Sequence, residues 1–428
     1  MDEDFLQYIW ANKLCLADCK KTTDGEEIEV VNIGKLNTDQ GPDFFNAQVK
    51  IGGIVWAGNI EVHVESDDWY KHHHETDPAY DNVVLHVVYK SCGRDILNSK
   101  GRKIPEVMLS ISEQLKERRN ELLGIGNNGT IKCCGKTSDI PQIVKTSWLD
   151  TLLMERLEQR QQRAASLMTE STDDLDSLFY VLLARALGGS INADQMQMLA
   201  RATPLRILLK HPTPLQTEAL LLGQAGLLSN IKKSEATEYE KRLLSEYEFL
   251  RAKFGVEPID ASVWKYLRLR PVNFPDVRIV QLAAIVRKIP GNFESTFRGT
   301  DAKTLIERLD VSPSEYWENH YRLGVESERK VEKRLGVDAR RLIIINALVP
   351  YLAHCAYRRC NTEGLDDAIE LLKGLKTEKN SIISEWESSG ISPRDEGEAQ
   401  ALIHLFKNYC EMGRCLHCRF GHAIMTRK

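Results

Sequence analysis

The sequence contains no long run of apolar residues. The longest candidate, Leu342 to Leu352 (LIIINALVPYL), has the length of a buried helix and contains a proline, whereas a transmembrane helix needs about 20 mostly apolar residues. The N-terminus, MDEDFLQYIW, is acidic and lacks a basic segment ahead of an apolar stretch, which argues against a secretory signal. We therefore expect a cytoplasmic protein without a membrane partner.

Several common nucleotide-binding and hydrolase motifs are also missing. The chain has no P-loop and no GxGxxG segment, so neither an ATP-driven motor nor a dinucleotide-binding site is indicated. It has no GxSxG elbow of the kind that carries a serine nucleophile. No internal repeat of fixed period predicts a solenoid. Nothing in the sequence indicates an oligomeric state.

Composition indicates an ordinary globular chain. Its 428 residues, 42% hydrophobic and 28% charged, are enough for two or three domains. Ten cysteines without a secretory signal indicate reduced thiols or metal ligands rather than disulfides. Residues 1–130 contain 22 Asp and Glu against 14 Lys and Arg, a net charge of −8, and the remainder contains 43 Lys and Arg against 39 Asp and Glu, or +4. An acidic part could collect divalent cations, although an imbalance of this size is also common without a function.

Hydrophobic periodicity divides the chain into a mixed first part and a helical second part. Alternating or β-branched segments predict strands at 26–33, 44–51, 54–64 and 82–90, with a further short pair at 94–97 and 103–109. Helical spacing predicts helices over 2–17, 67–74 and 110–122, and from Ser147 onward almost every segment is helical in pattern. The expected fold is α+β: a domain over 1–125 with a mixed sheet flanked by helices, a linker over 126–146, and an all-helical domain over 147–428.

The predicted hairpin over 44–64 carries the first candidate site. Asp43 stands where its first strand begins, and Glu61 and His63 share one face of its second strand because side chains alternate along a strand. Two converging carboxylates are typical ligands of Mg²⁺ or Mn²⁺, and such an ion lowers the pKa of bound water and stabilises charge on a phosphate. We expect Asp43 and Glu61 to bind the metal, and His63 to orient or activate water or to act as an extra metal ligand.

A histidine-rich segment follows this hairpin. We expect His72 and His74 to line the cleft and contact substrate phosphate, together with Asp77 and Tyr80. Alternatively, His72 and His74 join His63 and His86 in a second metal site that favours zinc or manganese. A histidine on an apolar strand, such as His86, is more often a hydrogen-bonded core residue, and His73 is expected in solvent.

Two motifs of the hairpin carry a resemblance. Pro42-Asp43 and Glu61-Val62-His63 resemble the signature of the PD-(D/E)XK nuclease superfamily, with His63 where that signature has lysine. The resemblance implies a restriction-endonuclease-like fold, metal-dependent cleavage of nucleic acid, and catalytic roles for Asp43, Glu61 and His63. It also suggests Glu3, on the first helix, as the additional carboxylate that some members of the superfamily supply. Because His63 replaces the lysine, one alternative is an inactive relative that binds nucleic acid or protein. A zinc-dependent hydrolase, suggested by the histidines, is another.

A longer block resembles a second family. Residues 41–89 (GPDFFNAQ, then GNIEVHVESDDWYKHHHETDPAYDNVVLHVVY) are similar to the hallmark of an uncharacterised bacterial family described only as a domain of unknown function. The later segment Arg270 to Pro275 and the cysteines near the C-terminus fit the same family. This resemblance covers nearly the whole chain and implies no activity.

The last candidate site is Cys410-x4-Cys415-x2-Cys418, a spacing typical of a metal knuckle. Structural zinc takes four cysteines or three cysteines and a histidine, and a [4Fe–4S] cluster takes four thiolates. The candidates for the fourth ligand are Cys133, Cys134, Cys15, Cys19, His417 and His422. We expect a structural Zn²⁺ or Fe–S staple, and the alternative is three reduced cysteines.

Paired arginines in the helical part are candidate nucleic-acid contacts. Arg340 with Arg341, and Arg358 with Arg359, could bind a phosphate backbone. A solvated amphipathic helix face is the simpler interpretation of the same pattern.

Overall fold

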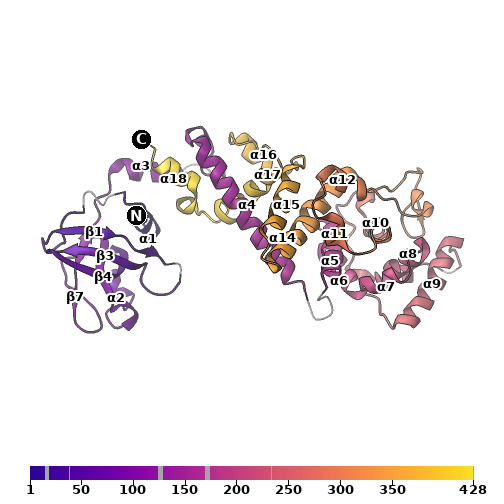
Figure 1. The fold of residues 1–428 in the computed structure, drawn as a ribbon, viewed down its shortest axis with the longest axis horizontal. Helices are drawn as coiled ribbons and strands as arrows, with labels where there is room; N and C mark the ends of the chain where they lie inside the picture. The colour runs from indigo at the N-terminus through magenta and orange to yellow at the C-terminus, as the bar shows by residue number, and fades with distance from the viewer. Residues whose placement is uncertain (15–18, 38, 124–128, 169–173, 233, 428) are drawn as a thin grey trace. The chain divides into compact units, whose positions relative to one another are not determined.

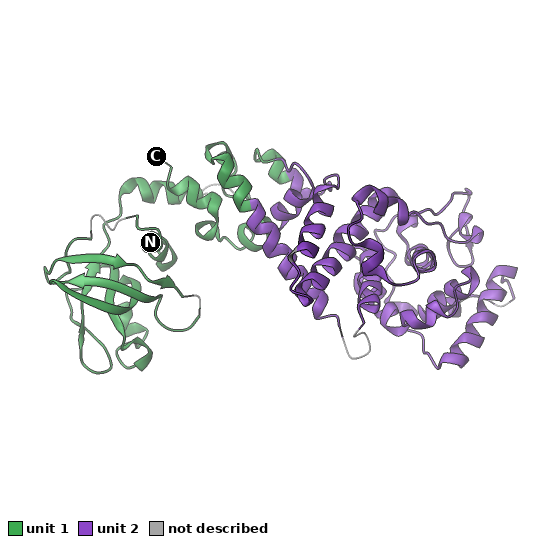
Figure 2. Ribbon diagram, in the orientation of Figure 1, with its two compact units in different colours: residues 1–148, 385–391, 405–428 green, residues 149–384, 392–404 purple. Residues whose placement is uncertain are grey.

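The computed structural model describes residues 1–14, 19–37, 39–123, 129–168, 174–232 and 234–427. Within them the chain forms two compact units. Unit 1 contains residues 1–148, 385–391 and 405–428, and unit 2 contains residues 149–384 and 392–404 (Figure 2). The boundaries expected near residues 125 and 147 stay a prediction. The observed division also assigns a C-terminal segment, which begins at Leu405, to unit 1, and the expected boundaries do not.

The centre of unit 1 is a curled mixed sheet of six strands (Figure 1). Its main path runs β1–β3–β4–β5–β8, and β2 pairs with β3. The first three strands of this path are antiparallel, and β4, β5 and β8 are parallel. The strands are β1 Ile28–Asn32, β2 Lys35–Leu36, β3 Phe44–Ile51, β4 Ile54–Glu65, β5 Val83–Lys90 and β8 Glu106–Met108. Together with the helical unit 2, this sheet confirms the predicted α+β class.

The β3–β4 hairpin forms where the sequence predicts it. Ile51 pairs with Ile54 across Gly52 and Gly53, which take φ values of 55° and 87°. Two successive positive φ angles define the tight hairpin turn that glycine adopts without strain. The turn fixes the register as far as the pair Ala47–Gly58. Between Ala47 and Phe44 a bulge, where Asn46 takes a φ of 57°, shifts the register so that Phe44 pairs with Ile60. The turn and the bulge together decide which side chains meet at the other end of the hairpin.

Helix α1, Glu3–Ala11, packs against β4 through buried Phe5, Leu6 and Ile9. The sequence predicts this helix to residue 17, but it ends at Ala11 because Lys13 takes a left-handed φ of 58°. Residues 15–18 of that prediction lie outside the described residues. The short helix α2, Asp68–Lys71, also packs against β4, and the predicted short pair is the hairpin of β6 Ile96–Leu97 with β7 Lys103–Ile104.

Unit 1 is completed by segments from the middle and the end of the chain. Helix α3, Glu113–Leu122, contacts the C-terminal helix α18, Arg419–Met425. The Arg118 guanidinium donates to the carbonyl of Met425 over 3.1 Å. The long helix α4, Gln142–Ala165, starts in unit 1 and continues into unit 2.

Unit 2 is mostly helical, as predicted. Helices α13, Val337–Ile343, and α14, Val349–Arg358, are joined by a π turn over 344–348. The apolar run Leu342–Leu352 is therefore helical, and most of its side chains are buried. No helix of the described residues has the length and apolarity needed to cross a bilayer. The further helices are α5 Leu175–Gly188, α6 Ala193–Ala202, α7 Leu205–Leu209, α8 Pro214–Gln224, α9 Glu238–Phe254, α10 Pro275–Lys288, α11 Phe293–Phe297, α12 Ala302–Arg308, α13 Val337–Ile343, α14 Val349–Arg358, α15 Thr362–Lys373, α16 Ser381–Ser388 and α17 Glu396–Leu405, with one small hairpin of β9 His320–Arg322 and β10 Val325–Glu326.

Candidate metal centre

Asp43 and Glu61 are held together by reciprocal backbone hydrogen bonds. The amide of Asp43 donates to Oε2 of Glu61 over 3.1 Å, and the amide of Val62 donates to Oδ2 of Asp43 over 2.9 Å. The two carboxyls therefore face each other across the start of β3 and the second half of β4. The hairpin brings them together as the sequence predicts.

Helix α1 supplies two more groups to the same place. Gln7 donates to Oδ1 of Asp43 over 2.8 Å, so both oxygens of Asp43 accept a hydrogen bond. One ligand atom each of Glu3, Glu61 and His63 lies within 4.8 Å of the other two. Glu3 is half-buried, and Glu61 is buried. A carboxylate from the helix thus joins a carboxylate and an imidazole from β4 in a group that can hold a metal ion.

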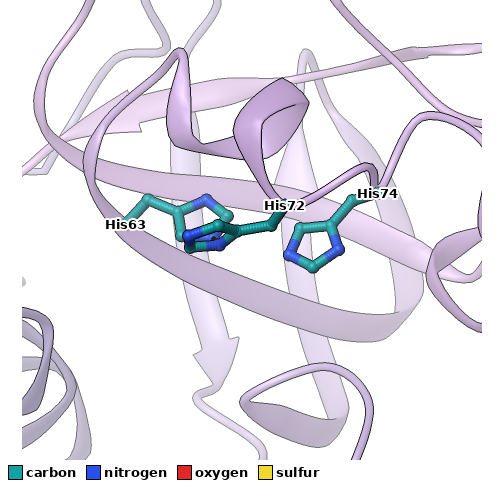
Figure 3. Close-up of side chains that lie close together, drawn as sticks. All are labelled: His63, His72 and His74. Atoms are coloured by element: carbon teal, nitrogen blue, oxygen red, sulfur yellow. Dashed lines mark hydrogen bonds between the residues drawn. The ribbon is translucent and has the colours of Figure 1, made fainter.

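Three imidazoles form a second, overlapping group (Figure 3). His63, His72 and His74 each place a ring nitrogen within 4.8 Å of the other two. His63 Nε2 lies 3.5 Å from Oε1 of Glu61, and His74 Nε2 lies 3.4 Å from the same oxygen. His72 Nδ1 lies 3.2 Å from His63 Nε2 and is the exposed member of the group. Because His63 belongs to both groups, it lies at the centre of the site.

Two buried residues behind His63, Glu106 and His86, favour one position for its ring hydrogen. Oε2 of Glu106 lies 3.2 Å from His86 Nδ1 and accepts from the Ser66 hydroxyl over 2.6 Å. Burial works to raise the pKa of Glu106, but the contact with His86 and the hydrogen bond from Ser66 outweigh it and leave the pKa below its usual value. The geometry at His86 Nδ1 is not that of a hydrogen bond. The nearby Glu106 carboxylate still favours a hydrogen on Nδ1, and in that tautomer His86 Nε2 is an acceptor.

The consequence for His63 follows from the next contact. His63 Nδ1 lies 2.9 Å from His86 Nε2. With the hydrogen of His86 on Nδ1, His63 Nδ1 donates to His86, which leaves the lone pair of His63 on Nε2. That nitrogen points to Glu61 and His72. A carboxylate that orients a ligand histidine is a usual second layer of metal sites. In this tautomer the lone pair of His63 Nε2 faces the site and can bind a metal ion.

The carboxyl groups of the site have raised pKa values, which a bound cation would lower. Burial, reinforced by the charge of Glu61, raises the pKa of Asp43 to about 7, and burial raises that of Glu61 to about 8. Burial and the charge of Asp43 also raise the pKa of Glu3 to about 7. Burial, followed by the neighbouring histidines, holds the pKa of His63 well below its usual value. A divalent cation would stabilise all three carboxylates in their ionised form.

Aromatic packing holds the histidine-rich segment in place. The Tyr80 ring stacks on His74 with 3.7 Å between ring centroids, and Trp69, fully buried, contacts the edges of His74 and His86. Asp77 is exposed, and its side chain accepts from the amide of Ala79 over 2.9 Å. Tyr80 thus borders the site, whereas Asp77 caps the turn at its edge.

The structure brings Asp43, Glu61, His63, His72 and His74 together, and it adds residues that the sequence did not single out. Gln7, Ser66 and Glu106 were missed because their partners are distant in sequence. His86, left open between ligand and core residue, is buried and contacts His63. The cysteines Cys410, Cys415 and Cys418 also lie in unit 1, away from the hairpin in sequence.

Three of the four paired arginines of the helical unit have internal partners. Arg340 donates to the carbonyls of Leu335 and Ile306, Arg341 contacts Asp338, and Arg359 contacts Glu294. These contacts favour the structural interpretation of the arginines.

Comparison with known proteins places the chain in a family. The family model described as "Protein of unknown function (DUF2851)" matches residues 3–381. The chain belongs to this family. It has no significant match among the curated proteins or among the solved structures. The DUF2851 match confirms the expected family of unknown function. It includes every residue of the candidate metal centre, and the cysteines at 410, 415 and 418 follow its end.

Proposed function

We propose that this protein is a divalent-metal-dependent hydrolase that cleaves phosphodiester bonds of nucleic acid. The observation that carries the proposal is the convergence of Glu3, Glu61 and His63, with their ligand atoms within 4.8 Å of one another. We propose nucleic acid as the substrate because Pro42-Asp43 and Glu61-Val62-His63 resemble a nuclease signature. The position of these motifs at one end of a hairpin in a mixed sheet supports that resemblance.

Each side chain has a role in this proposal. Glu3, Glu61 and His63 Nε2 bind the ion, which lowers the pKa of a water and offsets charge on the phosphate. Asp43 holds Glu61 in place through its own amide and keeps its carboxylate oriented by Val62 and Gln7. His72, the exposed imidazole of the site, is the group best placed to contact a substrate phosphate.

The ligand chemistry favours Mn²⁺ over Mg²⁺. Mg²⁺ prefers oxygen ligands in a regular octahedron, whereas Mn²⁺ accepts carboxylate oxygens together with imidazole nitrogen. The proposed set contains two carboxylates and one imidazole, with two more imidazoles adjacent.

Cleavage of defined oligonucleotides tests the proposal. Single-stranded and duplex DNA and RNA would be incubated with the full chain and Mn²⁺, Mg²⁺ or EDTA. We expect cleavage with Mn²⁺ that is lost in EDTA and in the Glu61→Gln and Asp43→Asn variants. Glu65→Gln is the matched control, because Glu65 lies on the same strand but pairs with exposed Lys71 and Lys90. Binding of nucleic acid without cleavage would indicate a scaffold instead.

A zinc hydrolase with another substrate is the second candidate. The observation in its favour is the group of His63, His72 and His74, because three imidazoles are a common ligand set of catalytic zinc. Metal analysis distinguishes the zinc hydrolase from the proposed nuclease. One tightly bound zinc per chain, lost when both His72 and His74 are changed to alanine, favours the zinc enzyme. Full retention of metal in that variant favours the carboxylate site.

A further inference from the structure

A pocket of about 480 Å³ lies in unit 2 beside helices α10 and α13. Its lining comes from these two helices, from residues 272–273 just before α10, and from residues 332–336 just before α13. A second pocket, of about 270 Å³, adjoins it and shares four lining residues, Asn273, Arg278, Ala339 and Leu342. All of them belong to unit 2 (Figure 2). Binding sites for small molecules usually have volumes of about 300–1,000 Å³, so the larger pocket has room for such a ligand.

Arg278 lines both pockets, and its guanidinium contacts only neutral groups. Nη1 donates to Oε1 of Gln281 over 2.9 Å, and Nη2 donates to Oδ1 of Asn273 over 2.7 Å. A guanidinium has five N–H groups and stays charged in proteins. The other three N–H groups of Arg278 have no partner among the residues that the structure describes. The pockets are therefore lined by a cation with three free donors.

The neighbouring amides hold this guanidinium in place. Gln281 is buried, and its Nε2 donates to the carbonyl of Lys333 over 2.9 Å, which leaves its Oε1 to accept from Arg278. Asn273 ends the 3₁₀ turn just before α10, and its Oδ1 accepts from Arg278. Asn273 also lines both pockets, so its Nδ2, which has no partner in the described part of the chain, is a further candidate donor. The donors are thus positioned before any ligand binds.

Arg278 differs from the other arginine of the larger pocket in having no counter-charge. Burial lowers the pKa of Arg278, and no carboxylate of the described residues acts against that shift. Arg334 lines the same pocket but pairs with Asp310. Buried charges are usually paired, because an unpaired charge away from water is costly. A bound anion would supply the counter-charge that Arg278 lacks.

Two carboxylates also line the larger pocket, and each has a partner other than Arg278. Oε1 of Glu332 accepts from the Ser312 hydroxyl over 2.5 Å. Oδ1 of Asp338 lies 3.0 Å from Nη1 of Arg341. No carboxylate is among the described residues that line the smaller pocket. The free donors of Arg278 are therefore not occupied by the carboxylates of the pockets themselves.

Apolar side chains form much of the remaining lining. The smaller pocket is lined by Leu187, Ile191, Leu269 and Ile343, and the larger one by Val272, Val277 and Val337. Val272 is 46% exposed and Val337 is 43% exposed, so apolar surface at the larger pocket is uncovered. A few fixed polar groups among apolar side chains are typical of sites for small organic ligands. The lining therefore suits a ligand with an anionic head and an apolar body.

We infer that Arg278 and Asn273 bind the carboxylate or phosphate group of a small organic anion, whose apolar part lies against α10 and α13. Arginine matches either group, because two of its N–H groups can contact two oxygens of the anion at once. The residues of this site all belong to unit 2, and the inference does not rest on the proposed hydrolase.

Calorimetric titration of the full chain tests this inference without an activity assay. The protein would be freed of metal with EDTA and dialysed into a buffer without phosphate or carboxylates. The probes are benzoate and phenyl phosphate, with benzamide as a neutral analogue and inorganic phosphate as the head group alone. We expect saturable binding of at least one of the two organic anions, and the one that binds more tightly identifies the preferred head group.

Two variants locate the binding. Arg278→Met should weaken it about tenfold or more, because hydrogen bonds to a charged group contribute at least that much. Arg334→Met is the matched control, since it removes an arginine of the same pocket that is exposed and already paired with Asp310. Its affinity should stay within about threefold of wild type, as expected for a change to an exposed ion pair.

Three results would overturn the inference. One is the absence of binding of both organic anions to wild-type protein. Another is wild-type binding in which benzamide equals benzoate, or inorganic phosphate equals phenyl phosphate, because the anionic head or the apolar body would then contribute nothing. The last is an affinity of Arg278→Met equal to that of wild type. Since the first two are measured on wild-type protein, a variant that fails to fold still leaves the inference open to refutation.

Discussion

Glu106 and His86 are direct neighbours on adjacent parallel strands, with Oε2 of Glu106 3.2 Å from Nδ1 of His86. Their contact favours one arrangement of the hydrogens on two histidines. With the hydrogen of His86 on Nδ1, His86 Nε2 accepts from His63, and the lone pair of His63 lies on Nε2, which faces the metal centre. We therefore expect Glu106, which lies behind the site, to influence metal binding.

Removal of the Glu106 charge should weaken metal binding. In Glu106→Gln, the side-chain amide no longer favours one tautomer of His86, so the lone pair of His63 is no longer favoured on Nε2. Changes to such outer partners typically cost about 10–100-fold in metal affinity. We expect a Mn²⁺ affinity lowered within that range, measured by calorimetry. The matched Glu65→Gln variant, an exposed carboxylate on β4, should bind as wild type does. Equal affinities of all three proteins would contradict this role of Glu106.

The metal-free protein should become less stable as pH rises. The pKa values of Asp43 and Glu61 are about 7 and 8 in the folded protein, well above their ordinary values of 3.8 and 4.5. The folded state therefore holds protons that the unfolded chain releases, and the stability that they contribute is complete near pH 4 and lost by about pH 8. We expect the melting temperature of the EDTA-treated protein to fall between pH 5.5 and 8.5.

A double variant isolates this effect from other titrations. Asp43→Asn with Glu61→Gln removes both groups, so the fall in melting temperature over the same pH range should be smaller than in wild type. Added Mn²⁺ should stabilise wild type most at high pH, where the carboxylates are ionised. A wild-type protein whose stability is flat or rises over this range relative to the double variant would argue against the raised pKa values.

Gly58 should tolerate no side chain. A β-carbon there would lie 2.4 Å from the carbonyl oxygen of Asn82 and 2.5 Å from Cγ1 of Val84, where β4 meets the start of β5. Overpacking of this kind costs about 1–3 kcal/mol. We expect Gly58→Ala to lower the free energy of unfolding by that amount in denaturant titration. Ile54→Ala, at an exposed position of the same strand, should change it by less than about 0.5 kcal/mol. Equal effects of the two changes would show that the strands have room to separate.

The local part of the site could be predicted from the sequence. The Gly52-Gly53 turn predicts the hairpin, and alternation along β4 puts Glu61 and His63 on one side. The bulge between Phe44 and Ala47, which shifts the register and brings Asp43 beside Glu61, could not be predicted in this way. The end of helix α1 could not be predicted in this way. Apolar spacing continues past Ala11, but the left-handed backbone at Lys13 ends the helix.

Contacts between segments that are distant in the sequence could not be predicted from it. Nothing near Glu106 in the sequence marks it as the partner of His86, since their meeting depends on the parallel pairing of β5 with β8.

The central claim is that Glu3, Glu61 and His63 hold one divalent metal ion. Calorimetric titration of the metal-free full chain with Mn²⁺ tests it most directly, with Glu61→Gln and Glu65→Gln measured in parallel. The account predicts saturable binding to wild type and Glu65→Gln. For Glu61→Gln it predicts a loss of affinity larger than the roughly 10–100-fold expected for an outer partner. Absence of binding to wild type, or undiminished binding to Glu61→Gln, would contradict it.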